Sequence, residues 1–162
     1  MSNTPPHRIL DALLCYNVYA LNLAFGRYYQ TAFGDTGFTY PKFLVLLALR
    51  DAGPMSLSDL SKQIGVEANT LSPLVKRMSD FGLMDRVRDP RDERKVLLTL
   101  KPFGKNVLEE AFTVADAGWN DLNLTQEEVE TANTILIKIR GRLESTPPSQ
   151  IMALPERPEG EN

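Results

Sequence analysis

The stretch "SLSDLSKQIGVEANTLSPLVKRMSDFG", residues 56–82, predicts two short helices joined by a tight turn. Ser56 is a favourable N-cap for a helix over 57–64, and Gly65 is a favourable residue to end it. A second helix is expected over about 68–81. Two helices joined in this way are a candidate helix-turn-helix.

The second of these helices opens with small polar side chains and carries two cations further along. These residues are Asn69, Thr70, Ser72, Lys76 and Arg77. A recognition helix enters the major groove of DNA by its N-terminal part, where short polar groups reach base edges. The pattern therefore indicates DNA binding.

Directly afterwards, "LMDRVRDPRDERKVLLTL", residues 83–100, predicts two strands around a charged turn at Asp89-Pro90. The basic residues of this hairpin are Arg86, Arg88, Arg91, Arg94 and Lys95. A thin β-ribbon with arginine at its tip fits the minor groove, and arginines also bind phosphates. A solvated helical hairpin with a charged turn remains the alternative.

Helices are expected on both sides of this segment. The first runs from after Pro5-Pro6 to about Phe33, and its apolar residues cover most of its circumference. A small domain can hardly bury such a helix, whereas a second copy of the chain could. Further helices are expected over 40–52, over 101–122, and from a capping box at Thr125 through Leu143. The predicted fold class of the whole chain is therefore mainly α with a small β-wing.

The composition limits the remaining function classes. Residues 1–108 hold 14 Lys/Arg and 10 Asp/Glu, whereas residues 109–162 hold 4 and 11, so only the first part is basic. A single cysteine and an N-terminus without a secretion-signal pattern favour a cytoplasmic protein. Polar residues interrupt the apolar segment 9–29, which argues against a membrane span.

The segments "LSDLSKQIGVEANTLSPLVKRMSDFGL" and "DPRDERKVLLTL" resemble the MarR family of winged-helix regulators, and the resemblance spans about residues 8–143. It implies a homodimer that binds a pseudo-palindromic DNA operator, with Arg94 in the minor groove and Asp92 holding it. The domains that it implies are listed in chain order: 1–36, a dimerisation helix with an N-terminal arm; 37–103, the DNA-binding lobe; 104–144, dimerisation helices; and 145–162, a flexible tail.

The stretch "LCYNVYALNLAFGRYY" narrows the resemblance to the organic-hydroperoxide-sensing, OhrR-type branch of that family. The resemblance implies that Cys15 is the peroxide-reactive group and that Tyr19, Tyr29 and Tyr40 hydrogen-bond its sulfur. A thiolate is the nucleophilic form of cysteine, and phenol O–H groups stabilise it.

If these residues have the roles that the resemblance implies, their spacing predicts a thiol site that spans two subunits. Cys15 and Tyr19 are four residues apart and share a helix face, but Tyr29 is about 15 Å further along the helix. An antiparallel partner helix would bring Tyr29 to the sulfur. Oxidation would give a sulfenic acid, which a small cellular thiol could convert to a mixed disulfide because the chain has no second cysteine.

Other interpretations stay open. Cys15 could be a packing residue in a repressor that a small aromatic or phenolic acid releases, or a sensor of quinones or reactive sulfur species. A thiol peroxidase is disfavoured because no other catalytic residues accompany the cysteine, so we expect no enzyme, no cofactor and no metal. The roles of Tyr16 and Tyr28 are unassigned.

Overall fold

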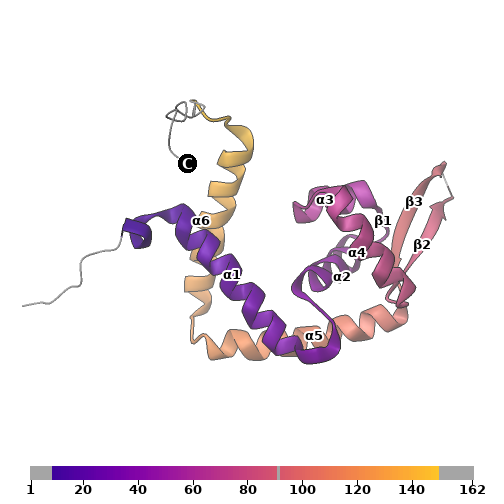
Figure 1. Ribbon diagram of the computed structural model, residues 1–162, viewed down its shortest axis with the longest axis horizontal. Helices are drawn as coiled ribbons and strands as arrows, with labels where there is room; N and C mark the ends of the chain where they lie inside the picture. The colour runs from indigo at the N-terminus through magenta and orange to yellow at the C-terminus, as the bar shows by residue number, and fades with distance from the viewer. Residues whose placement is uncertain (1–8, 91, 150–162) are drawn as a thin grey trace, which may run out of the picture. The chain divides into compact units, whose positions relative to one another are not determined.

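The computed structural model describes residues 9–90 and 92–149, and it divides the chain into two compact units, Met1–Asp121 and Leu122–Asn162. The first unit combines helices with one small sheet (Figure 1). Its elements are η1 Ile9–Ala12, α1 Leu14–Phe33, η2 Gly34–Thr36, α2 Tyr40–Ala52, β1 Met55–Ser56, α3 Leu57–Ile64, α4 Ala68–Asp80, β2 Met84–Asp89, β3 Asp92–Leu100 and α5 Pro102–Asp121. The predicted class, mainly α with a small β-wing, is confirmed.

The helix-turn-helix forms where the capping residues predict it. The Ser56 hydroxyl accepts a hydrogen bond from the backbone N–H of Asp59 at 3.1 Å, which caps α3. Gly65 ends α3 in the left-handed conformation with φ 69°, and its N–H bonds the carbonyl of Ser61. These local contacts bring α4 back against α3.

The apolar face of α4 is covered within the chain. Leu71, Val75 and Met78 recur every three or four residues and are all buried. Pro73 is the sixth residue of α4. The helix continues because the missing hydrogen bond would have reached only the carbonyl of Asn69, in the first turn.

The sheet has three antiparallel strands in the order β1-β3-β2. Strand β2 pairs with β3 from Met84 opposite Leu100 outward, and the register shifts between Arg88 and Asp89. The two-residue strand β1 was not predicted. It exists because Met55 pairs with Leu98, so a short link between α2 and α3 becomes extended by joining a distant strand.

The sequence predicted one unbroken first helix from after Pro5-Pro6 to about Phe33, and the structure differs from that prediction. Within the described residues, η1 and α1 are separated at Leu13, whose backbone is extended with φ −88° and ψ 114°. The side-chain amide of Asn17 donates to the carbonyl of Asp11 at 3.0 Å, so this polar group stabilises the break. The predicted N-terminal arm at residues 1–8 lies outside the described residues.

The core of the first unit joins α2 to the C-terminal part of α1 and to α5. Phe43 and Leu46 of α2 are buried, as are Phe33 of α1 and Leu108 of α5. The N-terminal two-thirds of α1 buries no side chain within this unit. The first unit therefore leaves most of its first helix uncovered.

The second unit contains α6, Gln126–Ser145. Its predicted capping box is confirmed, since Thr125 N–H donates to Glu128 at 2.8 Å and Glu128 N–H donates to the Thr125 hydroxyl at 3.2 Å. The backbone N–H of Thr125 lowers the pKa of the Glu128 carboxyl. Four large apolar side chains of α6 are exposed: Ile135, Leu136, Ile137 and Leu143.

None of the helices in the described part of the chain combines the length and the apolarity that a membrane crossing requires. Most of the predicted flexible tail falls on residues 150–162, outside the described residues.

Candidate nucleic-acid interface and thiol site

The side chains nominated for base contact lie together on the exposed face of α4. All five are solvent-exposed: Asn69, Thr70, Ser72, Lys76 and Arg77. The carboxamide oxygen of Asn69 accepts from the backbone N–H of Thr70 at 2.8 Å, a donor that also bonds the carbonyl of Glu67 at 3.0 Å. The burial of Leu71 and Val75 on the opposite face sets which side of α4 is offered to a partner.

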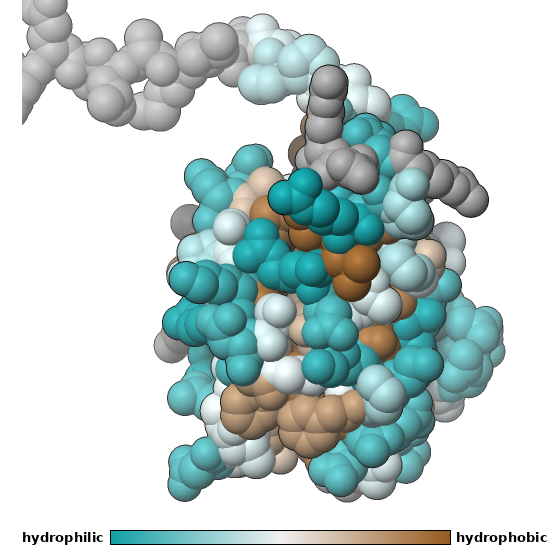
Figure 2. Space-filling model, turned by 90° about the vertical axis from the view of Figure 1, so that its right-hand side faces the viewer, coloured by the Kyte–Doolittle hydropathy of each residue, from teal (hydrophilic) through white to brown (hydrophobic). Residues whose placement is uncertain are grey.

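The wing presents the second group of cations. Arg86 and Arg88 on β2 are exposed, and Lys95 on β3 forms an ion pair with Asp92 at 3.7 Å. The side chain of Arg94 lies outside the described part, so its contact with Asp92 stays a prediction. On the side of the first unit where the strands lie, hydrophilic side chains surround smaller apolar areas (Figure 2).

The wing also interacts with α3. The Ser56 hydroxyl lowers the pKa of the Asp59 carboxyl, and the positive charges of Lys62 and Lys95 act in the same direction. Lys95 belongs to β3, so a cation of the wing contributes to the electrostatic surroundings of Asp59 in α3.

Cys15 lies in the first turn of α1 and is exposed. Tyr19, one turn further on, is 60% exposed, so both polar groups face the solvent in the single chain. Tyr29 is only 6% exposed and stacks on Tyr40, with ring centroids 4.6 Å apart and planes within 18°. Of the four predicted residues, Tyr29 and Tyr40 are in contact, and Cys15 and Tyr19 form a second pair that shares one face of α1.

These two pairs lie at opposite ends of α1. Fourteen residues separate Cys15 from Tyr29, which is about 21 Å along an α-helix. The phenols of Tyr29 and Tyr40 therefore lie beyond hydrogen-bonding reach of the sulfur in the same chain. Burial raises the pKa of the Tyr40 hydroxyl, so this group keeps its proton and remains a donor at neutral pH.

The surface around Cys15 is apolar. The exposed large apolar side chains on and just before the N-terminal part of α1 are Leu10, Leu13, Leu14, Val18, Leu21 and Leu23. Leu14 and Leu21 are 55% and 46% exposed, far more than leucines in a core. A continuous apolar helix face of this kind indicates a surface that another chain covers.

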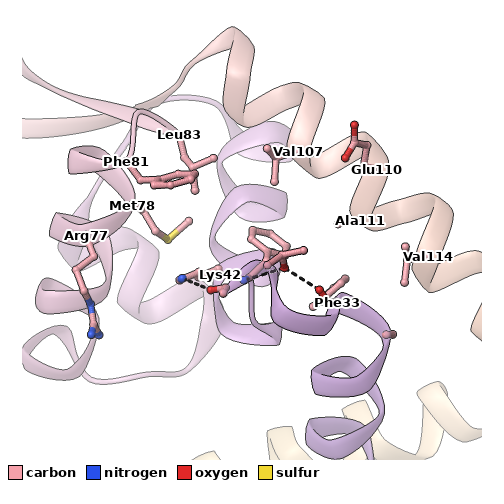
Figure 3. A pocket seen from close by; sticks show the side chains of 14 residues that line it. Phe33, Lys42, Arg77, Met78, Phe81, Leu83, Val107, Glu110, Ala111 and Val114 are labelled. Carbon is pink, nitrogen blue, oxygen red and sulfur yellow. Dashed lines mark hydrogen bonds between the residues drawn. The ribbon is translucent and has the colours of Figure 1, made fainter.

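A cavity of about 560 Å³ lies in the first unit, between the C-terminal end of α1, α2, α4 and α5. In Figure 3 the apolar side chains Met78, Phe81 and Leu83 lie on one side of it and Val107 and Val114 on the other. This size falls within the range of small-molecule sites.

Charged groups also line this cavity. Lys42 and Arg77 contribute cations, and Glu110 contributes a carboxylate. The ammonium group of Lys42 donates to the carbonyl of Gly37, in the loop that forms one wall. None of these side chains was predicted to line a cavity, because the lining comes from four separate segments that share no local motif.

Among the described residues, no three His, Cys, Asp or Glu side chains gather into a group able to hold a metal ion.

The comparisons with known proteins agree on one family. The sequence model of the MarR family matches residues 38–96. The HTH-type transcriptional regulator MgrA of Staphylococcus aureus is 31% identical over 131 residues, which are 80% of this chain and 89% of MgrA.

Two groups of solved structures are also similar. BpsR of Bordetella bronchiseptica, whose DNA binding is regulated by 6-hydroxynicotinic acid, superposes with a TM-score of 0.74 at 27% identity over 84% of this chain and 98% of its own. Reduced AbfR of Staphylococcus epidermidis bound to DNA superposes with a TM-score of 0.69 at 27% identity, over 81% of this chain and 90% of its own. Overoxidised AbfR bound to DNA is similar as well, at 26% identity and a TM-score of 0.65, over 79% of this chain and 90% of its own.

Proposed function

This chain belongs to the MarR family of DNA-binding transcriptional regulators, and on that basis we propose that it is a homodimeric repressor released from its operator when an organic hydroperoxide oxidises Cys15. The observation that carries the proposal is the place of Cys15, exposed within an apolar face of α1 that the rest of its unit leaves uncovered. The similarity to AbfR, solved in reduced and overoxidised forms, supports a redox role.

A second copy would cover α1 and complete the thiol site. Two α1 helices that cross antiparallel would place Cys15 and Tyr19 of one subunit near Tyr29 and Tyr40 of the other. The exposed apolar side chains of α6 would likewise be covered by a partner subunit. In this arrangement the phenols of both subunits donate to one thiolate, which stabilises its reactive form.

In the DNA-bound dimer each α4 would lie in a major groove and each wing beside a minor groove. Asn69, Thr70 and Ser72 would face base edges, and the cations on α4 and the wing would bind phosphates. Arg94, held by Asp92, would enter the minor groove. The two α4 helices must then match half-sites about 34–36 Å apart.

The proposed sensing reaction needs only the thiolate, the hydroperoxide and a proton, and no cofactor. The Cys15 thiolate attacks the outer oxygen of ROOH, an S–O bond forms as the O–O bond breaks, and the leaving alkoxide takes a proton to become ROH. The sulfur loses two electrons and becomes a sulfenic acid. A small thiol could then condense with it to give a mixed disulfide and water. Either product adds polarity or bulk to an apolar interface, which would shift the two lobes and misplace the α4 helices.

Replacing the thiol tests this function. Cys15→Ser should keep operator affinity within about twofold, because serine differs from cysteine by a single atom of similar size, and should lose release by cumene hydroperoxide. Intact mass after treatment should show one added oxygen in the wild type and none in the variant. Release of the serine variant at the wild-type dose would show that Cys15 is not the switch. Quinones and polysulfides tested in parallel would identify another oxidant.

The cavity supports a second candidate, a repressor released by a small aromatic acid. An apolar cavity of about 560 Å³ with Lys42 and Arg77 in its lining suits a ring that bears a carboxylate, and the similarity to BpsR favours this ligand class. Titrating the reduced protein–operator complex with 6-hydroxynicotinic acid and phenolic acids tests it. Ala111→Phe would fill the cavity and should block that response while leaving the hydroperoxide response.

A further inference from the structure

A close contact between α1 and α5 gives Tyr28 a place in the molecule. An ideal Cβ added to Gly118 of α5 would lie 1.5 Å from the hydroxyl oxygen of Tyr28 and 2.3 Å from its Cζ. These distances are far below any non-bonded contact. The phenol of Tyr28 therefore occupies the space that a side chain at position 118 would need.

Gly118 serves this contact and not a turn. It lies inside the 20-residue helix α5 and is itself buried, and its backbone is not in the left-handed region. Glycine inside a helix is less favourable than alanine by about 1 kcal/mol. The only structural use of this glycine among the described contacts is the room that it leaves for the Tyr28 ring.

The seated ring orients the next aromatic residue. Tyr28 meets Tyr29 edge to face, with centroids 5.5 Å apart and an interplanar angle of 85°. Tyr29 in turn stacks on Tyr40 at 4.6 Å. Edge-to-face and stacked pairs favour defined ring geometries. A ring held on α5 thus restricts the direction of the Tyr29 phenol at the end of α1.

We propose that Tyr28, seated on Gly118, is a positioning residue of the thiol site that aims Tyr29 and Tyr40 at Cys15 of the partner subunit. This inference rests on the proposed function. The Tyr28 hydroxyl faces the α5 backbone, so Tyr28 acts through the packing of its ring and is not an additional donor to the sulfur.

Three variants test the role of the contact between the Tyr28 ring and Gly118. Gly118→Ala pushes the ring off α5, Tyr28→Ala removes it, and Tyr28→Phe keeps the ring without the hydroxyl. Gly141→Ala is the matched control, because a Cβ there meets nothing within 4 Å. The measurement is the rate of Cys15 oxidation by cumene hydroperoxide between pH 5.5 and 9, followed by intact mass, together with the operator affinity of the reduced protein.

The two disruptive variants should oxidise roughly threefold to tenfold more slowly at pH 7, with the pH profile moved to higher pH, because misaligned donors stabilise the thiolate less. Tyr28→Phe and Gly141→Ala should follow the wild type, and all four should bind the operator as the wild type does. These differences in pH profile separate positioning from a loss of stability, which would leave the profile of the folded protein unchanged.

Two results would overturn the inference. One is a wild-type rate and pH profile in both Gly118→Ala and Tyr28→Ala. The other is Tyr28→Phe as slow as Tyr28→Ala, which would assign the effect to the hydroxyl. Neither Tyr28 variant introduces a clash, so the test holds even if Gly118→Ala fails to fold. Failure of the proposed function itself would look different: the wild-type thiol would not respond to hydroperoxide at all.

Discussion

Helices α4 and α1 both carry apolar side chains at helical spacing, but they differ in what covers them. In α4 the residues Leu71, Val75 and Met78 are buried by the same lobe, whereas in α1 the leucines near Cys15 stay exposed. The proposed DNA-reading helix is therefore packed within one chain. The proposed thiol site would need a second chain to complete it, and under that proposal an event at a subunit interface could control a separately folded DNA-binding lobe.

The largest effect is expected from a charge on the uncovered face of α1. Leu21→Glu should yield monomers, because a dimer would have to bury an unpaired carboxylate. Operator affinity should fall by roughly 10³-fold, since the two half-sites would no longer be bound together. Sedimentation and operator titration measure both quantities. Asn106→Glu, which adds the same charge to an exposed position of α5, is the control. A Leu21→Glu protein that remains dimeric would contradict the proposed interface.

Shortening a buried side chain of α4 should destabilise the DNA-binding lobe within each chain. Leu71→Ala should lower the free energy of unfolding by about 2–5 kcal/mol, because it leaves a cavity in a closed core. Denaturant unfolding should be measured in the monomeric Leu21→Glu background, where no dimer contact contributes to the free energy of unfolding. There Leu14→Ala in α1 should cost less than about 0.5 kcal/mol, since its side chain is already exposed. Equal losses from the two truncations would remove the contrast between the helices.

Loss of one wing cation should have a smaller effect. Arg88→Ala should weaken binding to all sequences alike and should reduce the slope of log affinity against log salt by about 1, the signature of one phosphate contact. Operator titrations between 50 and 200 mM salt give this slope. Arg140→Ala on α6 should leave it unchanged, and an unaltered slope in Arg88→Ala would place Arg88 away from the DNA.

The smallest effect is expected at the cap of α3. Ser56→Ala should cost about 1 kcal/mol of stability. Because the Ser56 hydroxyl lowers the pKa of Asp59, part of this contribution is present above the ordinary carboxyl range and is lost as the pH falls through the lowered pKa. The gap in stability between wild type and variant should therefore narrow on acidification, which thermal unfolding between pH 7 and pH 2 can measure. A gap that widens would contradict the assignment.

The segments that could be predicted are those whose signals act over a few residues. Ser56 and Gly65 bound α3, the capping box at Thr125 begins α6, and the Asp89-Pro90 turn separates two strands, all as expected. A cap or a tight turn needs only its own neighbours, so local sequence is enough to predict it.

The segments that were missed depend on distant partners. Strand β1 forms only because Met55 meets Leu98. The break at Leu13 has a local stabiliser in Asn17, but nothing in the apolar spacing signals it. The cavity draws its lining from four separated segments, so periodicity within any one of them could not reveal it.

Residue type and short spacing were enough to predict the helix-turn-helix, the wing and the lone thiol beside phenols. The stacking of Tyr29 on Tyr40, the contact of Tyr28 with Gly118 and the uncovered face of α1 around Cys15 became visible only from the packing of the helices. The two ring contacts join side chains from different helices, and the uncovered face is the part of α1 that those helices leave unpacked, so none of the three follows from a local sequence signal.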